Sequence, residues 1–198
     1  MFNDKYGLTQ AVLAGHKTMT RRLVAKKVII NSKVHTQLIH SGDNIDGLRV
    51  EYIFQASPYK IGEVVAITQS YRQIEKEIEK QGYPLDLKRE YRICAGYTNK
   101  MFVRAENMPH HIKITDVHVE RLQDISDEEC LREGVYGKKL GYTPSGYKPN
   151  KTYYTFANVN YCFDSPREAF ATLIDKISGK GTWDSSPLVW VYEFELVD

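Results

Sequence analysis

Lys17, Thr20, Arg21 and Arg22 lie close together in the chain and are residue types that nucleophilic catalysis uses. A threonine hydroxyl becomes a nucleophile when a base removes its proton. Lys17 can be that base if burial or the neighbouring cations Arg21 and Arg22 lower its pKa. A carboxylate from elsewhere in the chain would then orient a water molecule or the substrate amine. A strand threonine flanked by surface cations is the plainer interpretation, and the four residue types alone favour it.

The spacing of Lys17 and Thr20 sets a condition on the local structure. The two residues are three positions apart, so on a regular strand their side chains would point to opposite faces. They can converge only if residues 15–18 form a turn that runs into the strand. The site therefore depends on how the chain enters this strand and on which element supplies the acid.

Charge is distributed unevenly along the chain, although the formal net charge is only +2. Residues 1–34 hold seven Lys and Arg against Asp4, whereas residues 101–135 hold four basic and eight acidic side chains. A basic cluster of this kind can bind a polyanion. A solvated surface without a specific partner is the plainer interpretation, and the charge alone favours it, although both interpretations stay open at this point.

Composition excludes several classes of protein. The chain has 198 residues, of which 42% are hydrophobic and 26% charged, which excludes disordered, collagen-like and coiled-coil chains. No apolar run approaches the roughly 18 residues of a membrane span. The first residues lack the basic-then-apolar order of a secretion signal. We therefore expect a single domain over residues 1–198, monomeric, cytoplasmic and without a membrane partner.

No metal or cofactor is expected from the motifs. The cysteines Cys94, Cys130 and Cys162 are odd in number and widely spaced, unlike a disulfide framework or a zinc knuckle. His110 and His111 are adjacent, so on a strand they face opposite ways and do not share a metal easily. No phosphate-binding glycine loop and no nucleophile elbow occurs in the sequence.

Hydrophobic patterning predicts a mixed α+β fold. We expect a short helix capped by Thr9 and ending at Gly15, a charged helix that buries only Ile74 and Ile78, and two helices that begin at capping boxes. Strands are predicted from alternating or continuous apolar residues, at 48–55, 63–67, 101–103, 112–119 and 188–196. The helices are expected over 71–81, from Ser126 to Gly134, and from Ser165 to Gly179, the last with a stripe of Phe170, Leu173, Ile174 and Ile177.

Two features of this pattern point to a small barrel with additions. Ile112 and Ile114 share one parity and Val117 and Val119 the other, which predicts a β-bulge near Thr115-Asp116. Segments of about 26–47, 70–98 and 136–164 interrupt the pattern as peripheral insertions. The third holds six of the 14 tyrosines and has the length of a lid or binding loop. The predicted fold is a compact mixed β-barrel with two main packing helices.

The segment Gly15-His16-Lys17-Thr18-Met19-Thr20-Arg21-Arg22 resembles the G-x-K-T-x-T-x-R signature of the ASCH superfamily, whose barrel is similar to PUA domains. The chain looks most like the bacterial and prophage branch of that family. Supporting similarity lies in residues 59–67, 108–112, 119–126 with 133–135, and 179–194.

The resemblance implies a small β-barrel with helices at its openings and a cleft that faces the signature segment. RNA or a nucleotide is proposed to bind there in this family. The binding residues that it implies here are Gly15, Lys17, Thr18, Arg21 and Arg22. One branch is similar to an amidohydrolase that removes the acyl group from N4-acetylcytidine. Its lysine, threonine and glutamate fall on Lys17, Thr20 and Glu133, although a slip of one residue would select Arg132.

Two functions and one structural alternative follow. The first is an RNA- or modified-nucleoside-binding module, in which a base stacks on a tyrosine from 136–164 and the basic cleft binds phosphates. The second is an amidohydrolase, in which Lys17 deprotonates Thr20 and Glu133 positions water or protonates the leaving amine. The third keeps Thr18 and Thr20 for backbone hydrogen bonds alone. A cationic rim opposite Glu133 favours a nucleoside or a short single strand over a long nucleic acid.

Overall fold

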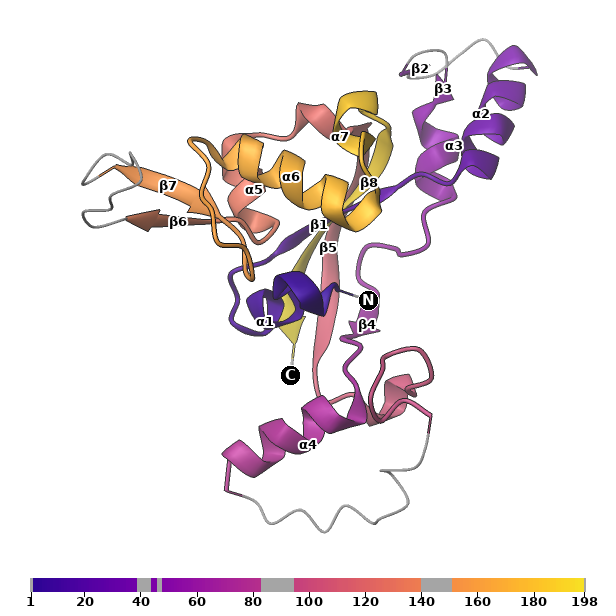
Figure 1. Cartoon of the computed structure of the whole chain (residues 1–198). Helices are drawn as coiled ribbons and strands as arrows, with labels where there is room; N and C mark the ends of the chain where they lie inside the picture. Colours follow the sequence, from indigo (N-terminus) through magenta and orange to yellow (C-terminus); the bar gives the residue numbers. More distant parts are fainter. Residues whose placement is uncertain (1, 39–43, 46–47, 83–94, 140–150, 198) are drawn as a thin grey trace.

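The computed structural model describes residues 2–38, 44–45, 48–82, 95–139 and 151–197. In this part of the chain seven α-helices surround a curled antiparallel sheet that forms half of a barrel (Figure 1). The fold is therefore mixed α+β, as predicted, with an open half-barrel in place of a closed one.

The main sheet has four strands in the order β1-β8-β5-β4, and every neighbouring pair is antiparallel. The strands are β1 (Met19–Leu23), β4 (Val64–Ala66), β5 (His111–Arg121) and β8 (Leu188–Val197). The register of β5 against β8 shifts between Ile114 and Asp116, which confirms the predicted bulge. On β8, Trp190, Tyr192 and Phe194 are all buried, so this strand is the centre of the core as expected.

Two capped helices pack beside each other over one side of the sheet (Figure 1). α5 (Asp127–Arg132) begins with a capping box of Ser126 and Glu129. α6 (Pro166–Ser178) begins where the Ser165 hydroxyl accepts a hydrogen bond from the Glu168 backbone, and it is followed by α7 (Thr182–Ser185). The buried stripe of α6 is shorter than predicted, because the Ile177 side chain at its end is 37% exposed.

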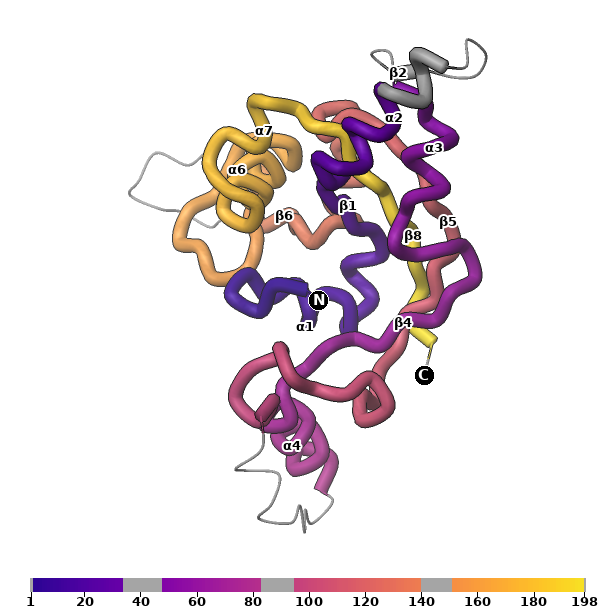
Figure 2. The backbone as a smooth tube through the Cα atoms, turned by 90° about the vertical axis from the view of Figure 1, so that its right-hand side faces the viewer, coloured from indigo at the N-terminus to yellow at the C-terminus, as the bar shows by residue number. Residues whose placement is uncertain are grey.

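The N-terminal segment lies between the sheet and α4 (Tyr71–Lys80), the helix at the bottom of the view (Figures 1 and 2). It forms a single turn, η1 (Asp4–Tyr6), and then α1 (Leu8–Leu13). Thr9 lies inside α1 and does not cap it, because Gly7 with φ 65° precedes the helix. The Thr9 hydroxyl instead donates to Asp4 Oδ1 at 2.6 Å, which ties the helix to the preceding turn.

The three predicted insertions contain secondary structure of their own and project from the half-barrel (Figures 1 and 2). They contain α2 (Lys26–Leu38) with β2 (Asn44–Ile45), α4 (Tyr71–Lys80), and the hairpin of β6 (Tyr136–Lys139) and β7 (Thr152–Thr155). α4 confirms the predicted charged helix, but its buried residues are Tyr71 and Glu75, whereas Ile74 and Ile78 are only half-buried.

Two predicted strands are wrong. Residues 48–55 form only the short strand β3 (Leu48–Arg49) and then the helix α3 (Val50–Gln55). Ile53, which the alternation placed on the polar face, is fully buried, and its carbonyl accepts the Trp190 indole N–H at 2.9 Å. Residues 101–103 form a turn, with Met101 and Phe102 74% and 63% exposed. At residues 48–55 tertiary packing overrides a short local pattern, whereas residues 101–103 form no strand and leave two of their apolar side chains exposed.

Candidate functional site

The alternation of β1 divides the signature segment between two faces of the sheet. Met19 and Arg21 point toward α5 and are buried, whereas Thr20 and Arg22 are half-buried and line a pocket on the other face. Successive side chains of a strand must point to opposite faces. Residues that are adjacent in the signature therefore lie in two different places, the buried side next to α5 and the pocket on the other face.

A turn does precede β1, and it brings Lys17 into the interior, although it does not bring Lys17 and Thr20 together. Gly15 ends the preceding helical segment with φ 71°, a conformation that side chains other than glycine seldom adopt. The backbone N–H groups of His16 and Lys17 both donate to the Ala11 carbonyl, each at 2.9 Å. This turn directs the Lys17 side chain toward Glu133.

The Lys17 amine is buried and makes three hydrogen bonds. It donates to the Met19 carbonyl at 2.7 Å, the Glu133 carbonyl at 2.8 Å and Glu133 Oε2 at 2.6 Å. A nitrogen with three acceptors is an ammonium group and has no lone pair to offer. Burial lowers the pKa of Lys17. The carboxylate of Glu133 opposes this shift, whereas the charges of Arg22 and Arg21 add to it. The site thus holds a buried cation that Glu133 and two backbone carbonyls stabilise.

Arg21 joins the same buried cluster from β1. Its Nε donates to Glu120 Oε1 at 2.8 Å, and its other nitrogens lie 3.3 Å from carboxylate oxygens of Glu129 and Glu133. Burial works against the charge of Arg21, but the three carboxylates outweigh it and raise its pKa. The charges of Lys17 and Arg21 are thus more than balanced by the three carboxylates, so these two residues do not form the exposed cationic rim that we expected.

Arg132 and Thr18 form a second contact beside this cluster. The Arg132 guanidinium pairs with both Glu193 carboxylate oxygens, at 3.2 and 2.8 Å, and its Nε donates to the Thr18 hydroxyl at 3.1 Å. The Thr18 N–H donates to the Arg132 carbonyl, and its own carbonyl accepts from Phe194. Thr18 therefore has a structural role, and Glu133 rather than Arg132 reaches Lys17.

A small pocket lies on the opposite face of β1. Its walls include Phe2, Thr20, Arg22, Tyr59 and Tyr192, with apolar residues of β4 and β5 behind them. The Tyr192 hydroxyl hydrogen-bonds the Ser57 hydroxyl at 2.7 Å, and its ring meets Tyr59 edge-on at 5.5 Å. The volume is ≈ 30 Å³, room for one or two water molecules and far below the roughly 300–1,000 Å³ of usual ligand sites.

Phe2 lies between the buried cluster and the pocket. Its ring centroid is 5.9 Å from Lys17 Nζ, and the same ring lines the pocket beside Thr20. Within the described chain no hydrogen bond joins the Thr20 hydroxyl to the Lys17 amine. The structure thus brings Lys17, Arg21 and Glu133 together and sets Thr20 and Arg22 apart from them. Gly15 is exposed and lines neither place.

The tyrosines of residues 136–164 do not line this pocket in the part of the chain that is described. Tyr136 and Tyr161 are 47% and 42% exposed, and Tyr153 is buried. The predicted positions Tyr142 and Tyr147 lie outside the described residues. The aromatic walls come instead from Phe2, Tyr59 and Tyr192, which sequence reasoning did not assign to the site.

Sequence reasoning also missed Glu120 and Glu129, which hold Arg21. Both belong to the acidic excess of residues 101–135. A count of charges does not tell which of these acidic side chains pair with Arg21 and which face solvent. The alternation of β5 could have identified Glu120. The bulge between Ile114 and Asp116 changes which residues after it share a face of the strand, and Glu120 follows that bulge.

Comparisons with known proteins give no relative: no family model, no curated protein and no solved structure matches this chain. Among the residues described, no three His, Cys, Asp or Glu side chains are grouped as a metal site would require. No helix in the described ranges is long and apolar enough to cross a membrane.

Proposed function

We propose that the protein binds a modified nucleoside, free or within a short single-stranded RNA, with the base at the mouth of the Thr20 pocket. The observation that carries this proposal is the composition of the pocket: a hydroxyl and a guanidinium beside three aromatic rings. Aromatic rings and arginine planes are the surfaces on which single-stranded bases stack. The resemblance of the signature segment to ASCH domains points to the same class of ligand.

The size of the pocket indicates which part of the ligand it holds. A volume of ≈ 30 Å³ is too small for a base ring but suits a substituent of a few heavy atoms. In this arrangement the base stacks outside, against Tyr59 or Arg22, and an exocyclic acyl or alkyl group enters beside Thr20. The pocket would then select modified over unmodified bases, because only the modified base fills it.

Calorimetric titration with N4-acetylcytidine and with cytidine tests this proposal. We expect the acetylated nucleoside to bind more tightly by about tenfold, roughly the effect of burying one or two methylene-sized groups. In Thr20→Leu a larger side chain fills the pocket, and the preference should disappear. The matched control is Thr115→Leu, at an exposed residue in the bulge of β5 that does not line the pocket. Equal affinity for both nucleosides, or no binding of either, would reject the proposal.

The second candidate is hydrolysis of an N-acyl nucleoside, favoured by the contact of 2.6 Å between Lys17 and Glu133. Lys17 would first pass a proton to Glu133 and then accept the proton of Thr20 as the hydroxyl attacks the acyl carbon. The amide C–N bond breaks, and the amine leaves with a proton. Water then hydrolyses the acyl-threonine to the free acid. This candidate comes second because the Lys17 amine donates to three acceptors, none of which is Thr20.

Product analysis separates the two candidates. Incubation with N4-acetylcytidine should leave the substrate intact if the site only binds. Release of cytidine and acetate that is lost in Thr20→Ala, by several orders of magnitude, would establish the hydrolase. Turnover that persists in Thr20→Ala would show that the reaction does not use this threonine.

A further inference from the structure

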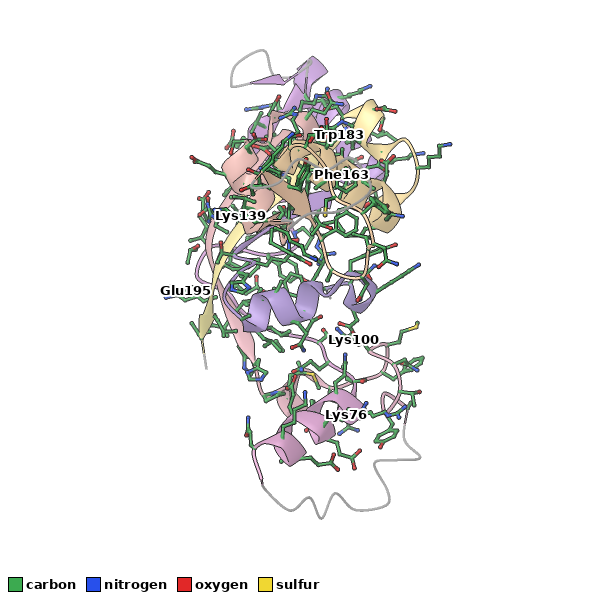
Figure 3. The ribbon with its side chains drawn as sticks, turned by 60° about the vertical axis from the view of Figure 1, so that its left-hand side comes forward. Lys76, Lys100, Lys139, Phe163, Trp183 and Glu195 are labelled. Atoms are coloured by element: carbon green, nitrogen blue, oxygen red, sulfur yellow. The ribbon has the colours of Figure 1, made fainter. Side chains whose placement is uncertain are left out.

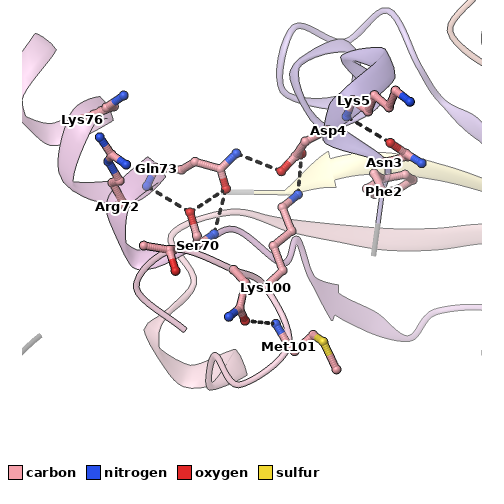
Figure 4. Close-up of a pocket in the computed structure, with 12 residues that line it drawn as sticks. Phe2, Asn3, Asp4, Lys5, Ser70, Arg72, Gln73, Lys76, Lys100 and Met101 are labelled. Carbon is pink, nitrogen blue, oxygen red and sulfur yellow. Dashed lines mark hydrogen bonds and ion pairs between the residues drawn. The ribbon is translucent and has the colours of Figure 1, made fainter. Parts of the chain in front are cut away.

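We infer that a second, larger pocket binds the sugar–phosphate chain of a single-stranded RNA next to the base held at the Thr20 pocket. This inference rests on the proposed function for the identity of the ligand. The second pocket has a volume of ≈ 710 Å³ and lies between the N-terminal segment, α4 and residues 98–101 (Figure 4). This volume is within the range of sites that hold nucleotide-sized ligands.

The charge of the pocket favours an anion. Four cationic side chains line it, Lys5, Arg72, Lys76 and Lys100, against the single carboxylate of Asp4. Lys100 is engaged, since it donates to Asp4 Oδ1 at 2.6 Å and to the Thr9 hydroxyl at 2.9 Å. Among the described residues no carboxylate forms an ion pair with Arg72 or Lys76. Those two cations are therefore available to phosphates.

The cations are held in place by well-formed local structure. Ser70 and Gln73 cap α4 reciprocally, so the first turn of the helix is fixed. Gln73 also donates to Asp4 Oδ2 at 2.9 Å, which attaches α4 to the N-terminal segment across the pocket (Figure 4). Arg72 and Lys76 are four positions apart on α4 and thus share one helix face. Both charges can therefore meet one anionic ligand from the same side of the helix.

Phe2 connects the second pocket to the first, because its ring lines both. Phe2 is only 8% exposed and forms part of the wall of each pocket, so a ligand whose base stacks at the Thr20 pocket lies beside the larger pocket. The residues that join here come from the N-terminus and from the inserted segment around α4. The larger pocket is consequently a feature that this insertion adds to the half-barrel.

The experiment compares N4-acetylcytidine with a pentanucleotide RNA that carries the same base in the middle. Both are titrated into the full chain and into Arg72→Gln/Lys76→Gln. The matched control is Lys176→Gln/Lys180→Gln, which removes two exposed lysines near the end of α6 and α7, and Figure 3 shows Lys76 far from Trp183 of α7. We expect the pentanucleotide to bind at least tenfold more tightly than the nucleoside in the wild-type chain.

In Arg72→Gln/Lys76→Gln this gain should be lost, and the slope of log affinity against log salt should fall by about 1.4, or roughly 0.7 for each phosphate contact. Nucleoside affinity and the control variant should not change. A gain that survives in the double variant, or that is lost equally in the control, overturns the inference and leaves the proposed function in place. A further outcome is that the pentanucleotide binds and is weakened by Arg72→Gln/Lys76→Gln, while the nucleoside does not bind at all. That result rejects the proposed function and supports the phosphate site.

Discussion

The Nζ atom of Lys17 lies 2.6 Å from Oε2 of Glu133, although 116 residues separate the two in the sequence. Glu133 is the residue that ends α5, and Lys17 comes two positions before β1 begins. The contact therefore fixes the end of a helix against the entry of a strand. Because both side chains are buried, each charge depends on the other for its solvation.

Replacing Lys17 alone should destabilise the fold strongly. Lys17→Met leaves the Glu133 carboxylate buried with only Arg21 at 3.3 Å, and the loss of one partner of a buried pair costs about 3–5 kcal/mol of unfolding free energy. The measurement is urea unfolding at neutral pH. The double variant Lys17→Met/Glu133→Met removes both charges and should recover part of this loss. A Lys17→Met chain within about 1 kcal/mol of wild type would show that the pair contributes little.

Gly134 follows Glu133 directly and should not tolerate a side chain. Its φ is 106°, and a Cβ would lie 3.0 Å from Leu8 Cδ2. Gly134→Ala should lower the free energy of unfolding by about 1–3 kcal/mol from backbone strain, with a further cost from the Leu8 contact. Gly179→Ala is the matched control, because its φ is 110° and nothing lies within 4 Å of its Cβ. Equal losses in the two variants would mean that Leu8 adjusts freely.

The mixed α+β fold, the bulge in β5 and the capped helices were predictable because the local sequence signals there agree with the packing of the whole fold. Ser126 with Glu129 begins a helix by its own hydrogen bonds, and the parity change around Thr115 can only be accommodated by a bulge. The strand predicted at 48–55 failed because the burial of Ile53 depends on Trp190, which is 137 residues away. No local pattern contains that contact.

The sequence predicted some residues of the site but not how they are arranged around it. The resemblance to ASCH domains implied that Lys17 and Glu133 share a site, and Lys17 does contact Glu133. The three-residue spacing already implied that Thr20 and Lys17 point apart, and the turn at Gly15 does not change this, because it directs Lys17 toward Glu133. The aromatic walls come from three separate segments, because Phe2, Tyr59 and Tyr192 are brought together only by the sheet topology.

His118 should make the stability of the fold depend on pH. Hydrogen bonding to Glu120 raises the pKa of His118 from 6.5 to about 9, burial opposes the shift, and Asp116 adds to it. A raised pKa in the folded state means that the stabilisation is complete below about pH 6.5 and is lost as pH rises through about 9. Unfolding free energies measured between pH 6 and pH 10 should therefore decline.

His118→Gln should remove this part of the decline, while His16→Gln, on an exposed residue, should retain it. A pH profile that is the same in His118→Gln and wild type would contradict this assignment.

Cys130 should be unreactive in the folded chain. Burial, helped by the nearby charge of Asp127 and opposed by Arg21, raises the pKa of its thiol to about 12. Since the thiolate is the reactive form, a maleimide at pH 8 should modify Cys130 only when α5 opens or the domain unfolds. Cys162 is partly exposed and should react promptly.

A Cys94→Ser background leaves these two cysteines for comparison, and Cys162→Ser then isolates Cys130. In that variant the labelling rate should rise with urea in proportion to the open population. The same rate should increase in Lys17→Met, because loss of the contact with Glu133 releases the end of α5 from β1. Labelling of Cys130 at the rate of a free peptide thiol, in the absence of denaturant, would mean that α5 is not held against the core as the Lys17 contact requires.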